Sequence, residues 1–252
     1  MTQRVTILGC RLDILDAEQA TDAIFDFVRE RAGAQVVTLG TEMVVHAQRD
    51  AAFREIVNDS ALSLCDTVGL LHVARRRGAD LRERVTGVEL VEHLCRRAAD
   101  EGVSVYFFGG AEGVAADAGA ILEARFPGLR IAGTRNGFFS GEEEDEIAEA
   151  IRRSGAGLLF VGLGSPRQEV WIARHVAQTG VGAAVGIGGS FDVLSGRVRR
   201  APLLWRRFGA EWLYRLIREP RRFRRQLALP YFVWLIALEQ LGLGRRKGMS
   251  ES

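Results

Sequence analysis

Short apolar runs alternate with longer amphipathic stretches along most of this chain. The apolar runs are too brief for free-standing helices and end at glycine or polar residues, which is typical of buried strands. The candidate strands are residues 5–8, 36–39, 61–65, 103–108, 129–133, 158–162 and 181–187, and residues 5–8 are either a first strand or an edge hairpin. The stretches between them have apolar residues at helical spacing, and the candidate helices include residues 17–31, 41–57, 88–101 and 114–126.

This order of elements predicts the fold class. Strands that alternate with helices favour right-handed crossovers and a mainly parallel sheet. We therefore expect an α/β, Rossmann-like fold, with a mainly parallel sheet flanked by helices and a basic helical C-terminal appendage. A length of 252 residues fits one α/β domain with an appendage, or two small domains. We place the core in residues 1–200 and the appendage in residues 201–252.

Residues 158–169 combine a strand signal with a helix-start signal. The apolar run stops at Gly162 and Gly164, and Ser165 as N-cap with Pro166 at the first helical position predicts a helix directly afterwards. Such a turn directs free N–H groups and the positive helix end at the carboxyl edge of a parallel sheet, where α/β proteins bind phosphorylated ligands. A plain strand-to-helix connection is the alternative.

Polar or glycine-rich turns follow other candidate strands. Asp66 stands at the end of the run at residues 61–65, where its carboxylate is either a catalytic base or the N-cap of the next helix. The glycine turn at residues 109–113 has the spacing G-G-x-x-G and is only weak evidence for a dinucleotide site.

The run of carboxylates at residues 142–146 could be mistaken for a metal site. Ser140 and Glu143 have the spacing of a capping box, so the run is predicted to begin a helix. The chain also contains no D-x-D sequence of the kind that holds a divalent ion on a nucleotide diphosphate. We therefore expect neither a metal site nor a cofactor.

Charge is distributed unevenly along the chain. The formal net charge is only +2, but residues 197–225 contain eleven arginines against Glu211 and Glu219. This basic segment requires an acidic partner: nucleic acid, anionic lipid or a phosphorylated substrate. Nucleic acid is disfavoured because no known base-reading motif accompanies the arginines.

An almost wholly apolar run at residues 227–238, interrupted at Pro230, follows the basic segment. It is too short to span a bilayer, which takes about 20 apolar residues. One prediction is an interfacial helix with a polybasic collar on an anionic membrane surface. The other is a core or dimer helix with a solvated basic face, and a dimer helix would make the protein a homo-oligomer.

Cys10, Cys65 and Cys95 are widely spaced in apolar surroundings, and we expect them to be reduced packing residues. The first residues lack a charged region followed by a long apolar core, so no signal peptide is expected. A cytoplasmic protein is predicted.

Several segments, in this order, resemble the WecG/TagA/CpsF family of bacterial glycosyltransferases, glycosyltransferase family 26. The resemblance extends from about residue 5 to residue 235, and its order and density make it highly specific. The matching segments lie at residues 37–42, 66–69, 83–87, 108–110, 162–169, 188–192, 200–202, 211–216 and 219–222.

The resemblance implies a metal-independent, inverting hexosyltransferase peripheral on the inner face of the bacterial plasma membrane. Its donor would be a UDP-sugar of N-acetylmannosamine, its uronic acid, or glucose, and its acceptor a saccharide linked to polyprenyl diphosphate. Family members build teichoic-acid linkage units, enterobacterial common antigen, and capsular polysaccharides or exopolysaccharides.

Roles for individual residues follow from the same resemblance. Asp66 would be the general base, and Thr38, Arg84 and Gln168 would orient the donor sugar and its phosphates. Inversion in one step needs one base and strong charge stabilisation of the departing UDP, which a carboxylate and an arginine cluster provide. Asp192 would lie in the nucleoside-binding turn. The other expected substrate-binding residues are Gly40, Gly109, Gly110, Gly164, Ser165 and Gly189, with Arg215, Arg222 and Arg225 closing over the diphosphate.

Two motifs depart from the family pattern. Where the family has Thr-x-Asn-Pro-Glu, this chain has Thr38-Leu39-Gly40-Thr41-Glu42, which loses the Asn side chain. Where the family has Pro-Asp-Gly, it has Cys65-Asp66-Thr67. These departures keep open a second interpretation, a catalytically impaired scaffold that binds nucleotide-sugars within a polysaccharide complex. A nucleic-acid-binding module that uses the arginine segment is a third.

Overall fold

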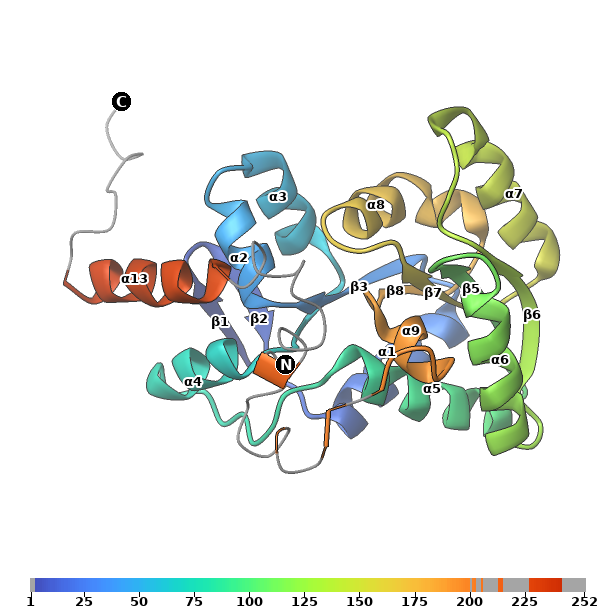
Figure 1. Ribbon diagram of the computed structural model, residues 1–252, viewed down its shortest axis with the longest axis horizontal. Coiled ribbons are helices and arrows are strands. Elements are labelled where there is room, and N and C mark those ends of the chain that lie inside the picture. Colours follow the sequence, from blue (N-terminus) through green and yellow to red (C-terminus); the bar gives the residue numbers. More distant parts are fainter. Residues whose placement is uncertain (1–2, 200, 203–204, 206–212, 215–226, 242–252) are drawn as a thin grey trace.

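The computed structural model describes residues 3–199, 201–202, 205, 213–214 and 227–241 (Figure 1). Within these residues, six parallel strands form one sheet in the order β4-β3-β8-β7-β5-β6, which confirms the predicted α/β, Rossmann-like class. The strands are β3 (Ala34–Leu39), β4 (Leu62–Cys65), β5 (Ser104–Gly109), β6 (Arg130–Arg135), β7 (Leu158–Gly162) and β8 (Ala183–Gly186).

Helices cover both faces of the sheet, because alternate strand residues point to opposite sides (Figure 1). Phe107 packs in a core with α1, α5, α6 and α9, whereas its neighbour Phe108 packs with α7 and α8 on the other face. The helices of the first face are α1 (Ala17–Glu30), α5 (Gly87–Glu101), α6 (Val114–Arg125) and α9 (Ser190–Leu194). Those of the second are α2 (Thr41–Ala47), α3 (Ala51–Asp59), α7 (Glu144–Ser154) and α8 (Arg167–Thr179).

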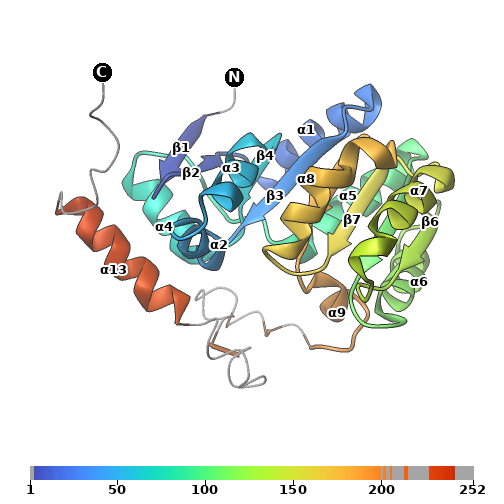
Figure 2. The ribbon, with the colours of Figure 1, turned by 90° about the horizontal axis from the view of Figure 1, so that it is seen from above.

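A third core covers the second face of the sheet over β3 and β4 and extends past the β4 edge. There the antiparallel hairpin of β1 (Arg4–Ile7) and β2 (Cys10–Asp13) packs with α2, α3 and α4 (Val68–Arg76). Helix α13 (Ala228–Gln240) joins the same core through Phe232 and Ile236. Figure 2 shows α13 along the side of the molecule that α2 and α4 form. The described helix of the predicted appendage is therefore seated on the core, and a domain boundary at residue 200 stays a prediction.

Asp13 fixes the hairpin to the sheet. Its buried carboxylate accepts hydrogen bonds from Arg4 Nε and from the backbone N–H of Ser63 on edge strand β4, each at 2.8 Å. Arg11 forms a second ion pair with it at 3.3 Å. The carboxylate thereby satisfies a backbone donor that an edge strand leaves unpaired.

Two local predictions are wrong. The expected single helix at residues 41–57 is two helices, because the Asp50 side chain accepts from the Phe53 N–H at 2.9 Å and starts a new helix at Ala51. Pro230 does not interrupt the apolar run, since it lies in the first turn of α13, where its missing N–H removes no intrahelical bond.

Other local predictions are confirmed. Ser140 and Glu143 form the capping box, which precedes α7 through a short 3₁₀ turn, Gly141–Glu143. Cys10, Cys65 and Cys95 are buried and free, as expected of packing residues. In the part of the chain that the structure describes, no helix has the length and apolar character needed to cross a membrane.

The sheet order places a crevice at the carboxyl ends of β3 and β8. The chain leaves β3 into α2 on one face and leaves β8 into α9 on the other, since these helices belong to different cores. Such a topological switch point is where open α/β sheets bind their ligands. The turns after β4 and β7 end at the same edge and complete the surroundings of the crevice.

Candidate active site

A pocket of about 750 Å³ opens at this carboxyl edge. It is lined by Thr38, Asp66, Arg84 and Gln168, the four residues predicted to take part in catalysis. They come from the end of β3, the end of β4, the loop before α5 and the first turn of α8. Parallel strands therefore bring together residues that are far apart in sequence.

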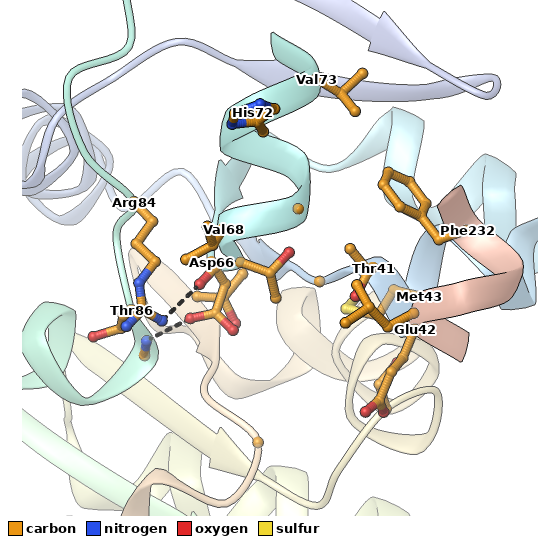
Figure 3. Close-up of a pocket in the computed structure, with 18 of the residues that line it drawn as sticks. Thr41, Glu42, Met43, Asp66, Val68, His72, Val73, Arg84, Thr86 and Phe232 are labelled. Atoms are coloured by element: carbon orange, nitrogen blue, oxygen red, sulfur yellow. Dashed lines mark hydrogen bonds between the residues drawn. The ribbon is translucent and has the colours of Figure 1, made fainter. Parts of the chain in front are cut away.

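Asp66 is held at the end of β4 by both its backbone and its side chain. Its N–H donates to Leu39 O at 3.0 Å, and its Oδ1 accepts from the backbone N–H of Gly87 at 3.2 Å (Figure 3). Gly87 is the first residue of α5, so the carboxylate satisfies a donor that the start of a helix leaves unpaired. The predicted cap of the next helix is wrong, because the N-cap of α4 is Thr67 and no side chain caps it.

Arg84 lies beside Asp66 at the pocket wall. Its Nη1 donates to the backbone carbonyl of Asp66 at 3.4 Å, and the next residue, Val85, donates its N–H to Cys65 O at 2.7 Å (Figure 3). The loop is thus attached to β4, and a guanidinium lies next to a carboxylate. Burial raises the pKa of the neighbouring Cys65 thiol to about 12, so this group is no nucleophile at neutral pH.

Thr38 closes the pocket from β3. It is buried, and its hydroxyl donates to Gly186 O on the adjacent strand β8 at 2.7 Å. This bond uses the only hydrogen of the hydroxyl, so Thr38 presents an acceptor oxygen to a ligand.

Gln168 is fixed at both ends of its amide. Oε1 accepts from the Gly188 N–H at 2.9 Å, and Nε2 donates to Glu169 Oε1 at 2.6 Å. Because a carboxylate accepts and the Gly188 N–H donates, these two partners determine which way the amide points. The side chain needs a glycine beside it, since a Cβ on Gly186 would lie 2.8 Å from Nε2.

Ser165 is not the N-cap of α8. The helix begins at Arg167 with Pro166 as N-cap and no capping side chain. The Ser165 hydroxyl instead interacts with the Glu169 carboxylate. The predicted cap is wrong because a buried acceptor four residues away engages the hydroxyl.

The chain is similar to known proteins over nearly its whole length. Residues 5–246 match the glycosyl transferase WecG/TagA/CpsF family. A curated relative from Bacillus spizizenii, an N-acetylglucosaminyldiphosphoundecaprenol N-acetyl-beta-D-mannosaminyltransferase, is 33% identical over 226 residues, which cover 88% of this chain and 87% of the relative.

The chain belongs to the WecG/TagA/CpsF family of glycosyltransferases.

Among the substrate-binding residues expected from the WecG/TagA/CpsF resemblance, some line the pocket and others do not. Gly40, Gly164, Ser165 and Gly189 do. Asp192, Gly109 and Gly110 are outside the described lining, and their roles stay predictions. Arg215, Arg222 and Arg225 lie outside the described residues.

The glycines after β5 have a structural reason of their own. Gly109 has φ +134°, and a Cβ there would lie 2.4 Å from Gly162 O. Gly110 has φ +71° and donates its N–H to Gly162 O at 3.0 Å. The G-G pair thus permits the close approach of two adjacent strand ends.

Glu169 has no role in the sequence-based interpretation, although it lies within the WecG/TagA/CpsF segment at residues 162–169. Its side chain is fully buried, and desolvation raises its pKa, opposed by hydrogen bonds from Gln168 and Ser165. Among the described residues, its Oε2 has no hydrogen-bond partner. In the sequence, the only sign that Glu169 is buried is its place next to a polar residue at the start of a helix, directly before a run of apolar residues.

Acidic and histidine side chains are scattered in the structure. In the described part of the chain, no group of three or more His, Cys, Asp or Glu is arranged to hold a metal ion. Metal independence of this WecG/TagA/CpsF protein stays a prediction.

Proposed function

We propose that this chain transfers a sugar from a UDP-sugar to a saccharide carried on a polyprenyl diphosphate, with inversion and without a metal ion. The convergence of Thr38, Asp66, Arg84 and Gln168 in one pocket supports this proposal. The Bacillus spizizenii relative is named for N-acetylmannosamine transfer to N-acetylglucosaminyldiphosphoundecaprenol. N-acetylmannosamine is therefore the first donor sugar to test, followed by its uronic acid and glucose.

Asp66 is the general base in this proposal. The acceptor hydroxyl attacks the anomeric carbon from the face opposite UDP, and its proton passes to the Asp66 carboxylate. As the new C–O bond forms, the bond to UDP breaks and the diphosphate leaves with the electron pair. The hydrogen bond from the Gly87 N–H orients the carboxylate before the reaction.

Arg84 stabilises the negative charge that develops on the leaving diphosphate. A guanidinium binds phosphate oxygens through paired N–H donors. The arginines at positions 215, 222 and 225 supply further positive charge in this proposal. Together they would perform the task that a divalent cation performs in other transferases.

Thr38 and Gln168 position the donor. Gln168 is already held by the Gly188 N–H and Glu169, so its amide needs no reorganisation when the substrate binds. The Thr38 oxygen is available as an acceptor for a sugar hydroxyl. Preorganised groups of this kind favour the transition state at little entropic cost.

Attachment to the anionic inner face of the plasma membrane is part of the proposal. Helix α13 and its two cap residues expose large apolar side chains: Leu227 is 50%, Val233 59%, Trp234 52% and Leu241 71% exposed. The adjacent segment at residues 197–225 contains eleven arginines. Apolar contact combined with positive charge is the usual basis of peripheral binding to anionic lipid.

The direct test is a transfer assay with a panel of UDP-sugars, polyprenyl-diphosphate-linked N-acetylglucosamine as acceptor, anionic liposomes and a chelator. We expect product with one donor, released UDP in equal amount, and an inverted anomeric configuration. Product only after addition of a divalent cation would overturn metal independence. UDP-sugar binding without turnover on any lipid-linked acceptor would instead support the scaffold interpretation.

A further inference from the structure

Beyond Asp66, the pocket continues as an apolar groove between α4 and α13. Neither a sugar nor a nucleotide needs this part of the pocket, because its walls consist mainly of aliphatic and aromatic side chains. The groove-lining apolar residues are Val68, Gly69 and Val73 on α4 and Leu229, Phe232, Val233 and Ile236 on α13. Figure 3 shows Val73 on α4 and Phe232 on α13, both above and to the right of Asp66.

Helices α4 and α13 contact each other near Asp66 and again about two turns farther along, and these two contacts define the direction of the groove between them. At the catalytic end, a Cβ on Gly69 would lie 3.7 Å from both Leu229 Cδ1 and Phe232 Cε1, an ordinary van der Waals contact, so α4 and α13 are packed together there; the close approach that requires glycine is to Thr41 Cγ2, at 2.9 Å. At the other end, Arg77 forms an ion pair with Glu239. The groove therefore leads away from Asp66 along α4, over about 12 Å at about 1.5 Å per residue.

The groove is open to a ligand from outside. Val233 lines it and is still 59% exposed, and Val68 at its catalytic end is 37% exposed. Apolar surface of this kind gains free energy when a hydrophobic ligand removes it from water.

We propose that this groove binds the first isoprene units of the polyprenyl chain of the acceptor. The inference rests on the proposed function. The acceptor saccharide must bring a hydroxyl to Asp66, so the lipid attached to the same molecule has to leave the pocket nearby. The groove provides an apolar exit that is continuous with the catalytic end and leads to the exposed apolar side of α13.

Charge along α4 agrees with this occupant. His72 and Arg76 lie one turn apart, and both line the same pocket. They give the groove a rim of hydrogen-bond donors and positive charge. The diphosphate precedes the polyprenyl chain along the acceptor, so His72, nearer the catalytic end, is the donor placed for it, whereas Arg76 stands at the far end of the groove.

The test uses the full-length chain and detergent-free acceptors, N-acetylglucosaminyl diphosphates esterified with methyl or with one, two or three isoprene units. Each buried CH₂-sized group contributes about fourfold in binding. We therefore expect kcat/KM to rise by at least about tenfold over the first isoprene units and then to level off. Equal kcat/KM for all four acceptors would overturn the groove while leaving the proposed function intact.

Two variants on the groove wall refine the test. Val73→Gln should lower the ratio of kcat/KM for the longest acceptor to kcat/KM for the methyl acceptor. Val73→Phe narrows the groove, so kcat/KM should stop rising at a shorter prenyl chain. Ile121→Gln, at an exposed apolar position on α6 outside the pocket, is the matched control and should leave the ratio unchanged. Melting curves by circular dichroism establish that each variant is folded.

A photo-crosslinking prenyl analogue gives a readout that does not depend on turnover. An acceptor with a diazirine in its first isoprene unit should label peptides from α4 and α13, even if no donor supports transfer. Failure of transfer together with this labelling would contradict the proposed function alone. Labelling elsewhere, or an equal gain in kcat/KM from saturated alkyl chains of the same length, would overturn a groove built for polyprenyl.

Discussion

Gly40 and Thr67 face one another at the pocket wall. A Cβ on Gly40 would lie 3.5 Å from Thr67 Cγ2, an ordinary van der Waals contact, and no other atom would be as near as 4 Å. Each belongs to one of the two motifs in which the chain departs from its family pattern. The departures are therefore neighbours in space, and the Thr67 methyl group occupies part of the volume beside the missing side chain.

Restoring Asn at position 40 tests this coupling. The Gly40→Asn variant should fold, because the backbone φ of −109° suits any residue and the Cβ has room. The effects of Gly40→Asn and Thr67→Gly on kcat/KM for each UDP-sugar should be non-additive, by about 0.5–3 kcal/mol, as expected for residues in contact. Strictly additive effects in the double-mutant cycle would show that the two positions act independently.

Replacement of the proposed base separates binding from catalysis. Asp66→Asn keeps an oxygen that can accept from the Gly87 N–H, so the fold around α5 should persist. We expect the transfer rate to fall by about 10²- to 10⁴-fold with little change in UDP affinity. Calorimetry with UDP and single-turnover kinetics measure the two quantities. Asp80→Asn, in the exposed loop after α4, is the control, and an equal loss of rate there would remove Asp66 from the mechanism.

Glu169 predicts a pH-dependent stability. Desolvation raises its pKa in the folded protein above the ordinary value of 4.5, so the folded state favours the protonated carboxyl. The stabilising contribution is complete below pH 4.5 and is lost as the pH rises through the raised pKa. Glu169→Gln removes the ionisation, so its melting temperature relative to the parent should increase with pH over this range. A difference that does not change with pH would show that the carboxyl does not titrate there.

Asp13 should contribute to stability without affecting catalysis. Asp13→Ala leaves the buried Ser63 N–H without its acceptor, which costs about 1–3 kcal/mol. Chemical denaturation should show this loss, while kcat/KM measured well below the unfolding temperature stays unchanged. Asp22→Ala, which removes an exposed ion pair with Arg97, is the matched control and should cost at most about 1 kcal/mol. Equal losses of stability in the two variants would contradict the assigned role of Asp13.

The sequence alone determined the class of fold and the order of its elements, because hydrophobic periodicity and capping signals are local. The alternation that predicts the parallel sheet, the Ser140 capping box and the candidate Asp66 follow from residues close together in the chain, whereas Gln168 became a candidate through the family resemblance. The family resemblance likewise depends on short segments that are preserved in order.

Only the tertiary structure decided which of these segments meet. Thr38 bonds to Gly186, 148 positions later, because β3 and β8 are neighbours in the sheet, and no local pattern encodes that pairing. The same holds for Asp66, because its carboxylate accepts a hydrogen bond from the first residue of α5 and does not cap the helix that follows Asp66 in sequence. The apolar groove forms only because α13 packs beside α4, although the two helices are far apart in sequence. Glu169 is buried only because α8 packs against the assembled sheet. Long-range packing determines these features, so they become visible only when the chain is folded.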